Sequence, residues 1–237
     1  MAEETSSRIF APGLLDGKVC VVSGAGTGLG KATALELTGL GATVIGCGRR
    51  SEPLEGMVKE ISERGGKAEF GALDIRDDEA VDGFMDGVVE RHGRIDLLVN
   101  NAGGQFLSPA EAISPKGFRT VIDLNVQGTW QMTHAAATKA FIPQGEGKVV
   151  SITVSPHMGF PGMVHTGAAR AAVENMMRTL SVEWARFAVT VVAICPGSRT
   201  TDEELAELVC FLLSPAGGYF SGCRFDLGAV PGLISSS

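Results

Sequence analysis

The chain has 237 residues, 44% of them hydrophobic and 20% charged, so it can bury a substantial core and is not intrinsically disordered. Its net charge is −7 and its basic residues form no run beyond Arg49–Arg50, which argues against a nucleic-acid partner. No apolar run approaches the roughly 20 residues that span a bilayer, and the acidic, polar beginning lacks the apolar stretch of a secretion signal. We therefore expect a cytoplasmic protein with no membrane partner.

The cysteines and glycines narrow the class further. Five cysteines are present without a Cys-x-x-Cys pair, and Cys20, Cys47 and Cys195 sit in apolar, strand-like runs. This pattern favours reduced, buried thiols over a disulfide framework or a metal site. The 32 glycines gather at the ends of apolar runs, which is typical of tight turns between strands and helices.

Short apolar runs alternate along the chain with longer helical patterns. In chain order they predict a strand at 18–24, a helix at 30–41, a strand at 42–48, a helix at 52–66, a strand at 67–75, a helix at 77–93, a strand at 95–103, a helix at 117–141, a strand at 148–155, a helix at 165–187, a strand at 189–197, a helix at 202–214 and a last strand within 219–228. Strands separated by helices form parallel units with right-handed crossovers. We predict an α/β fold with a doubly wound parallel sheet, a single domain over 1–237 with its core at 16–228 and loosely held ends at 1–15 and 229–237.

A glycine-rich stretch, Ser23–Gly30, lies between the first strand and the first helix. In this position Gly24 permits the tight turn, Gly28 lets backbone N–H groups approach a pyrophosphate, and Gly30 lets the helix pack closely on the strand. The helix N-terminus adds a positive dipole end. The stretch predicts a dinucleotide site of the Rossmann type, although a turn without a ligand would have the same glycines.

The spacing Gly24-xxx-Gly28-x-Gly30 resembles the TGxxxGxG loop of the short-chain dehydrogenase/reductase family, with Ser23 in place of Thr. Four further motifs of that family follow in order, so that the resemblance covers 16–228: Leu73-Asp74-Ile75, Asn100-Asn101-Ala102-Gly103, Asn125 within a helix, and Cys195-Pro196-Gly197. The resemblance implies a nicotinamide cofactor held by Ser23, Gly24, Thr27, Gly28, Leu29, Gly30, Arg49, Arg50, Asp74, Ile75, Asn101, Ala102, Gly103, Arg170, Pro196 and Gly197. It also implies a homodimer or homotetramer built through the helices at 117–141 and 165–187.

The end of the second strand discriminates between the two nicotinamide cofactors. A site for NAD(H) needs an acid there to accept a hydrogen bond from the ribose 2′-hydroxyl. This chain has Gly48-Arg49-Arg50 instead, and two guanidinium groups suit a 2′-phosphate. The sequence therefore favours NADP(H), with a solvated basic turn as the alternative.

The catalytic pair of the family, Tyr and Lys in YxxxK, is absent. The single tyrosine, Tyr219, stands near the C-terminus, where we expect it to be a packing residue. Thr166 and Arg170 take the Tyr and Lys positions, and Arg170 can bind the ribose hydroxyls but cannot give up and recover a proton. Where the family has a serine after the fifth strand, this chain offers Thr153 and Ser155.

Two stretches, 102–109 and 160–170, resemble the trans-2-enoyl-CoA and 2,4-dienoyl-CoA reductase branch of the family. That branch implies hydride transfer from NADPH to C3 of a 2-enoyl thioester, followed by protonation at C2. The candidate catalytic residues are Asn125, Ser155 and Arg170 for the enolate-like oxygen, and His165 as a proton donor. Glu174 and Arg178, where the enoyl-CoA reductases place their later Tyr and Lys, read more simply as an ion pair on the helix surface.

The connection after Gly197 is short. Family members carry several dozen residues there, which close over the substrate, whereas here residues 196–201 lead directly into the helix at 202–214. We expect an open pocket for a small-molecule substrate, and an acyl-CoA is the substrate that the sequence favours. The alternatives are a carbonyl or alcohol substrate, or a cofactor-binding protein that has lost proton transfer.

Overall fold

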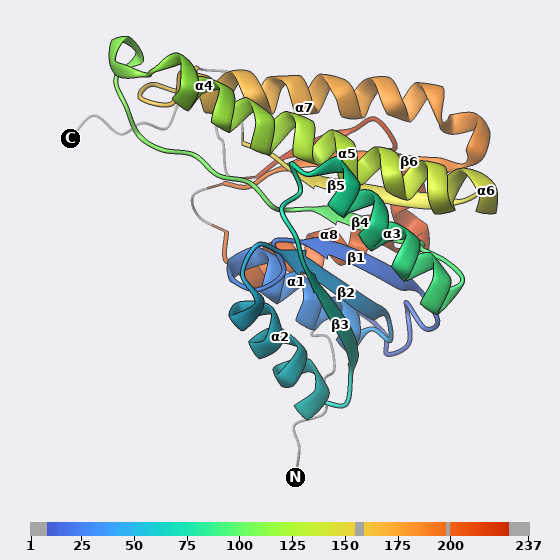
Figure 1. Ribbon diagram of the computed structural model, residues 1–237. Helices are drawn as coiled ribbons and strands as arrows, with labels where there is room; N and C mark the ends of the chain where they lie inside the picture. Colours follow the sequence, from blue (N-terminus) through green and yellow to red (C-terminus); the bar gives the residue numbers. More distant parts are fainter. Residues whose placement is uncertain (1–8, 155–158, 198–199, 228–237) are drawn as a thin grey trace.

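Seven short strands form the central sheet, which is parallel throughout, and β-branched residues are frequent in β1, β2, β5 and β6 (Figure 1). The computed structural model describes residues 9–154, 159–197 and 200–227. The strands are β1 (Val19–Ser23), β2 (Thr43–Gly48), β3 (Lys67–Ala72), β4 (Leu97–Asn100), β5 (Gly147–Ile152), β6 (Val189–Cys195) and β7 (Arg224–Asp226), in the order β3-β2-β1-β4-β5-β6-β7. The predicted fold class is confirmed.

The helices follow the predicted order. They are α1 (Gly28–Gly39), α2 (Ser51–Glu63), α3 (Asp78–His92), α4 (Pro115–Ile122), α5 (Gly128–Ala136), α6 (Ile142–Gln144), α7 (Val164–Glu183) and α8 (Asp202–Leu213). The predicted helix at 117–141 is α4, α5 and α6 joined by the π-helical segments Asp123–Gln127 and Ala137–Phe141. Ser114 caps the N-terminus of α4, where its hydroxyl accepts a hydrogen bond from the Gly117 N–H.

The last strand predicted within 219–228 is confirmed as β7, which follows a 3₁₀ turn at Pro215–Phe220. The expectation for the N-terminal end needs correction. Within the predicted loose end 1–15, Leu15 is 2% exposed and its N–H donates to the Leu40 carbonyl at 2.8 Å, so this part of the end is packed. Residues 1–8 and 229–237 lie outside the described residues.

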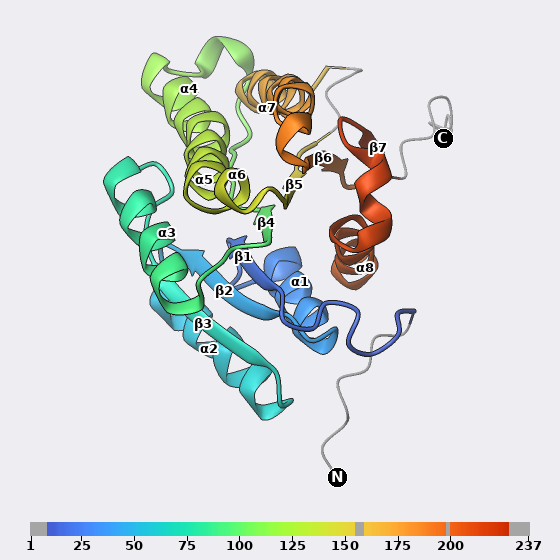
Figure 2. The ribbon, with the colours of Figure 1, turned by 90° about the vertical axis from the view of Figure 1, so that its right-hand side faces the viewer.

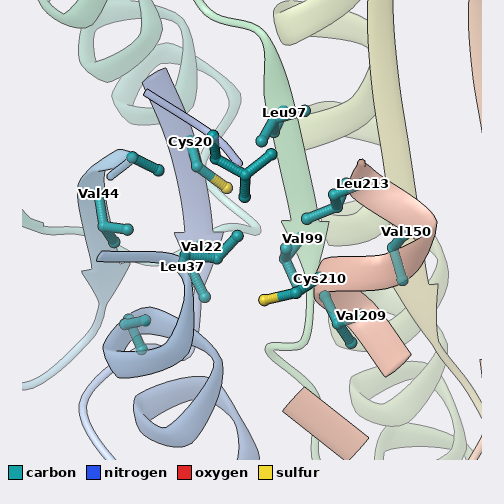
Figure 3. Close-up of a cluster of buried hydrophobic side chains, with 14 of the residues drawn as sticks. Cys20, Val22, Leu37, Val44, Leu97, Val99, Val150, Val209, Cys210 and Leu213 are labelled. Carbon is teal, nitrogen blue, oxygen red and sulfur yellow. The ribbon is translucent and has the colours of Figure 1, made fainter. Parts of the chain in front are cut away.

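Helices cover both faces of the sheet, because side chains alternate along each strand. Cys20 and Val22 of β1 point toward α1, α2 and α8 (Figure 3). Val19 and Val21 point to the opposite face, where α3, α5 and α7 pack. The sheet is therefore doubly wound. Within the described residues, no helix is long and apolar enough to cross a membrane.

The strand order reverses between β1 and β4, which are neighbours in the sheet (Figure 2). The chain leaves β1 toward β2 and β3 on one side, and returns to β4 and β5 on the other. In sheets of this kind the connections diverge at the carboxyl ends of the two central strands and leave a crevice between them. This crevice is where a ligand site is expected.

At the opposite edge of the sheet, Asp96 ties β1 to β4. Its buried carboxylate accepts hydrogen bonds from the Val19 N–H at 2.9 Å, from Lys18 at 3.0 Å and from Arg94 at 2.8 Å. Burial alone would raise the pKa of this carboxyl, but the hydrogen bonds from Arg94, Val19 and Lys18 outweigh it, so the pKa lies below its ordinary value.

We predict that Asp96→Ala lowers the free energy of unfolding at pH 7 by about 2 kcal/mol, because the Val19 N–H loses a charged acceptor. The contribution of Asp96 is present above the ordinary carboxyl pKa and is lost as the pH falls through the lowered folded-state value. Urea unfolding should therefore show a difference from wild type that shrinks as the pH falls. Glu146→Ala, which removes an exposed partner of the same two cations, is the control and should cost less than about 0.5 kcal/mol. Equal losses for both variants would contradict this assignment.

Candidate cofactor and active site

One hydroxyl group, that of Ser23, connects the two strand ends that border the crevice. Oγ of Ser23, the last residue of β1, accepts hydrogen bonds from the N–H groups of Asn101 at 3.1 Å and Ala102 at 3.0 Å. It donates to the Val99 carbonyl at 3.3 Å. The Asn101 amide donates in return to the carbonyls of Ser23 and Gly24, at 3.2 and 3.3 Å. Ser23 and Asn101 thus join the ends of β1 and β4. The Ser23 hydroxyl and the Asn101 amide nitrogen are bonded within the protein.

The glycines of the loop between β1 and α1 are required by its shape. Gly24 and Gly28 have φ angles of +68° and +53°, in the left-handed region. A Cβ at Gly30 would lie 2.1 Å from the Gly24 carbonyl oxygen. Thr27, which precedes α1, makes no side-chain hydrogen bond to the helix end, and the first N–H groups of a helix have no partner within it. This end of α1 is therefore able to bind an anion.

A cleft of about 530 Å³ lies along this loop. Its lining contains eight of the cofactor residues predicted from the sequence: Gly24, Thr27, Arg49, Arg50, Asp74, Ile75, Ala102 and Gly103. Of the others, Ser23, Gly28, Leu29, Gly30 and Asn101 support the loop and the strand ends beside it, while Pro196 and Gly197 follow β6. The cleft brings residues from three strand ends and one loop together at this edge, and their binding of a cofactor stays a prediction.

Six further residues line the cleft that were not among the predicted cofactor residues: Gly26, Gly48, Pro53, Leu54, Leu73 and Leu124. Pro53 shows why. A Cβ at Gly26 would lie 2.7 Å from the Cβ of Pro53, so the start of α2 closes against the glycine loop. The signal available in the sequence was that α2 begins directly after β2, which places its first turn at the same sheet edge.

Asp74 is oriented by its neighbour Arg76. The Arg76 Nε lies 2.9 and 3.1 Å from the two carboxylate oxygens. Hydrogen bonds from Arg76 hold the pKa of the Asp74 carboxyl below its ordinary value, and Arg49 adds attraction. The carboxylate therefore stays ionised beside the arginines of the cleft. Its role in holding a cofactor stays a prediction.

Arg170 is a buried cation beside the cleft. It is 7% exposed, and Nη1 donates to the Ile152 carbonyl at 2.9 Å. Among the described residues, its buried Nε has no hydrogen-bond partner. Burial lowers the pKa of this guanidinium to about 10. A Cβ at Gly103 would lie 2.5 Å from Nη2, so the guanidinium group lies directly against the cleft wall and suits a ligand rich in hydroxyl groups or negative charge.

Asn125 sits in the π-helical segment between α4 and α5 and is fully buried. Its amide donates to the carbonyls of Gly104 and Val121, both at 2.8 Å, and its oxygen accepts from the Gly104 N–H at 3.3 Å. Both amide hydrogens are bound by backbone, so neither is free for a substrate oxygen. In this geometry Asn125 positions Gly103 and Gly104 against Arg170.

His165 is fully buried at the start of α7, edge-on to Phe106 with ring centroids 4.3 Å apart. Its Nδ1 accepts a hydrogen bond from the Thr166 N–H at 2.9 Å. The ring hydrogen of the neutral form is therefore on Nε2, which has no partner within the described part of the chain. Ser155, the fourth predicted catalytic residue, lies outside the described residues.

Two expectations outside the cofactor set are wrong. Glu174 does not pair along its helix with Arg178 but accepts a hydrogen bond from Arg224 of β7 at 2.8 Å, and another from Thr153 at 3.4 Å. Tyr219 is 91% exposed, so it is not a packing residue. The four-residue spacing along the helix predicted an ion pair between Glu174 and Arg178, but Arg224 of β7 lies close enough to Glu174 to pair with it instead.

A second hollow, of about 750 Å³, runs along the exposed side of α7. Its lining is largely apolar, with Glu174, Arg178 and Arg224 among it: Ala110, Gly159, Phe160, Pro161, Gly162, Val164, Gly167, Ala168, Ala171, Glu174, Asn175, Arg178 and Arg224. Glu174 is one helical turn beyond Arg170, so this hollow begins near the buried cation.

A family model described as short chain dehydrogenase matches residues 18–206. The chain belongs to this family of oxidoreductases, which use a nicotinamide cofactor. The expected resemblance is thereby confirmed, including its closeness to the dienoyl-CoA reductase branch described next.

Among the similar proteins is a probable 2,4-dienoyl-CoA reductase of Bacillus subtilis, 32% identical over 238 residues that cover 88% of this chain and 94% of the relative. Because 88% of 237 residues is fewer than 238, this alignment places gaps in the present chain. A peroxisomal 2,4-dienoyl-CoA reductase of Rattus norvegicus is also 32% identical, covering 91% of this chain and 84% of the relative.

Solved structures agree. The citronellol catabolism dehydrogenase of Pseudomonas aeruginosa superposes with a TM-score of 0.90 at 38% identity, covering 94% of this chain and 98% of that chain. A xylitol dehydrogenase with bound NAD⁺ gives a TM-score of 0.85 at 26% identity, covering 90% of this chain and 98% of that chain.

We predict that Ser23→Ala lowers the free energy of unfolding by about 2 kcal/mol, because the N–H groups of Asn101 and Ala102 lose their acceptor. Ser23→Thr keeps the hydroxyl and should lose less than about 0.5 kcal/mol. Chemical denaturation of the two variants beside the wild type measures both values. If the threonine variant is as unstable as the alanine variant, the shared hydroxyl is not what joins the two strands.

Proposed function

We propose that this protein is an NADP(H)-dependent reductase of 2-enoyl thioesters of the acyl-CoA type. The observation that carries the cofactor assignment is the end of β2. Arg49 and Arg50 both line the cleft there, and the strand ends in Gly48 without an acid. A pair of guanidinium groups can bind a 2′-phosphate with charge-assisted hydrogen bonds, whereas a 2′-hydroxyl would find no carboxylate acceptor at this strand end.

We predict that Arg49→Ala weakens NADPH binding about tenfold, the equivalent of one charged hydrogen bond, and leaves NADH binding unchanged. Isothermal titration of both cofactors measures this. Arg91→Ala, which removes an exposed arginine on α3, is the control for net charge and should change neither affinity. Equal binding of NADH and NADPH, together with no effect of Arg49→Ala, would refute the preference.

Two features support a thioester substrate. The relatives named as 2,4-dienoyl-CoA reductases match along most of the chain. In addition, the hollow along α7 provides an apolar surface, from Phe160, Val164 and Ala168 among others, that suits an acyl chain. Arg178 brings positive charge to the same hollow, whereas Arg224 is paired there with Glu174.

For the reaction, the bound cofactor supplies a hydride to C3 of the substrate. Arg170 would hold ribose hydroxyls and place a positive charge near the reacting end of the cleft, with Asn125 keeping Gly103 and Gly104 in position against it. The proton for C2 would come from Nε2 of His165 in its protonated, imidazolium form, and the neutral ring that remains is the form whose Nδ1 accepts the Thr166 N–H at 2.9 Å. Ser155 remains a candidate for binding the enolate-like oxygen.

A catalytically impaired, cofactor-binding protein is the second candidate. It is favoured by the absence of tyrosine from the position of Thr166 and by Asn125, whose amide hydrogens are both bound by backbone. A carbonyl or alcohol substrate is a third reading, supported by the similarity to the citronellol catabolism dehydrogenase.

The test follows NADPH absorbance with a panel of 2-enoyl-CoA and 2,4-dienoyl-CoA esters beside a panel of ketones. We predict oxidation of NADPH with the thioesters, reduced at least tenfold in His165→Gln. Turnover with ketones alone would favour the carbonyl reading. NADPH binding without turnover on any compound would leave the impaired reading.

We also propose a homodimer or homotetramer. Helices α5 and α7 lie side by side on one face of the molecule (Figure 1). They leave apolar side chains exposed, with Trp130 39% and Val182 75% exposed. Helices that cover only their own sheet would not need such residues on the outer side.

A further inference from the structure

The helix that follows the short connection, α8, begins beside the glycine loop of the cofactor site. Helices α1 and α8 share one face of the sheet and contribute to one hydrophobic cluster (Figure 2). Both begin at the carboxyl edge of the sheet, because each follows a parallel strand. Oδ2 of Asp202, the first residue of α8, lies 3.6 Å from the position of a Cβ at Gly28, the first residue of α1.

The first turn of α8 is fixed in place. The Thr201 hydroxyl accepts from the Glu204 N–H at 3.2 Å, and Glu204 accepts from the Thr201 N–H at 2.9 Å. This reciprocal pair uses Glu204. Asp202 and Glu203 are the other two acids of that turn, and both are exposed, but Asp202 is the one that lies near Gly28.

A carboxylate at this position acts on the same groups that would bind a cofactor diphosphate. The free N–H groups at the start of α1 and the dipole ends of both helices attract negative charge. The same positive helix ends that would attract a diphosphate therefore also favour the Asp202 carboxylate. A diphosphate placed at Gly28 would instead meet a like charge at close range.

We propose that Asp202 sets the affinity of this protein for its dinucleotide, as a built-in anion that opposes the diphosphate group. This inference rests on the proposed function, since it needs a dinucleotide in the cleft. It goes beyond that function by assigning a role to α8, which contributes no residue to the lining of the cleft. The residue acts on affinity and not on the choice between NADP(H) and NAD(H), because both cofactors carry the diphosphate and differ only at the ribose 2′-position.

The test measures the dissociation constant of NADPH for the wild type, Asp202→Asn and the matched control Glu203→Gln, which removes the same charge from the same turn. At low ionic strength we expect Asp202→Asn to bind NADPH about three- to tenfold more tightly, and Glu203→Gln to match the wild type within about twofold. Adenosine 2′-monophosphate, which carries the 2′-phosphate but no diphosphate, should bind all three proteins equally. Thermal unfolding of each protein checks that it is folded, and Asp202→Ser replaces Asp202→Asn if the latter is not.

Three results would overturn the proposal. These are an unchanged NADPH affinity in Asp202→Asn, an equal gain in Glu203→Gln, or an equal gain for adenosine 2′-monophosphate. The failure of the proposed function looks different, since in that case neither NADPH nor NADH binds to any of the proteins. That result would remove the basis of both proposals.

Discussion

The hydroxyl of Ser23 joins β1 and β4, the two parallel neighbours at which the order of strands in the sheet reverses. Its oxygen accepts hydrogen bonds from the two backbone N–H groups that follow β4, and the Asn101 side chain donates a hydrogen bond to the Ser23 carbonyl at the end of β1. The glycine loop, the start of α1 and the segment after β4 therefore form one rigid unit. The position of Arg170 against Gly103, and the clasp of Asn125 on Gly104, depend on that unit being in place.

The buried guanidinium of Arg170 distinguishes this site from one built around a tyrosine and a lysine. A lysine can share in proton movement, whereas arginine stays charged even with its pKa lowered by burial to about 10. Arg170 thus supplies charge and hydrogen bonds. Any proton transfer has to come from another group, and His165 is the residue that we propose for it.

The connection between β6 and α8 is short, and its two sides meet different parts of the structure. Helix α8 begins beside the glycine loop, where Asp202 lies near Gly28. Helix α7, which packs on the opposite face of the sheet, borders the second hollow. The proposed roles of the cofactor and the substrate therefore concern separate surfaces on the two faces.

The order of strands and helices, the doubly wound sheet and the cofactor edge could be predicted from the chain itself. Their determinants are local: unbroken apolar runs, helical periodicity, and glycines where a turn or a close approach excludes a Cβ. The partners of Glu174, the exposure of Tyr219, the backbone bonds that occupy Asn125 and the approach of Asp202 to Gly28 could not. Each of these depends on contacts between segments far apart in the chain, and such contacts exist only once the sheet has brought its strand ends together.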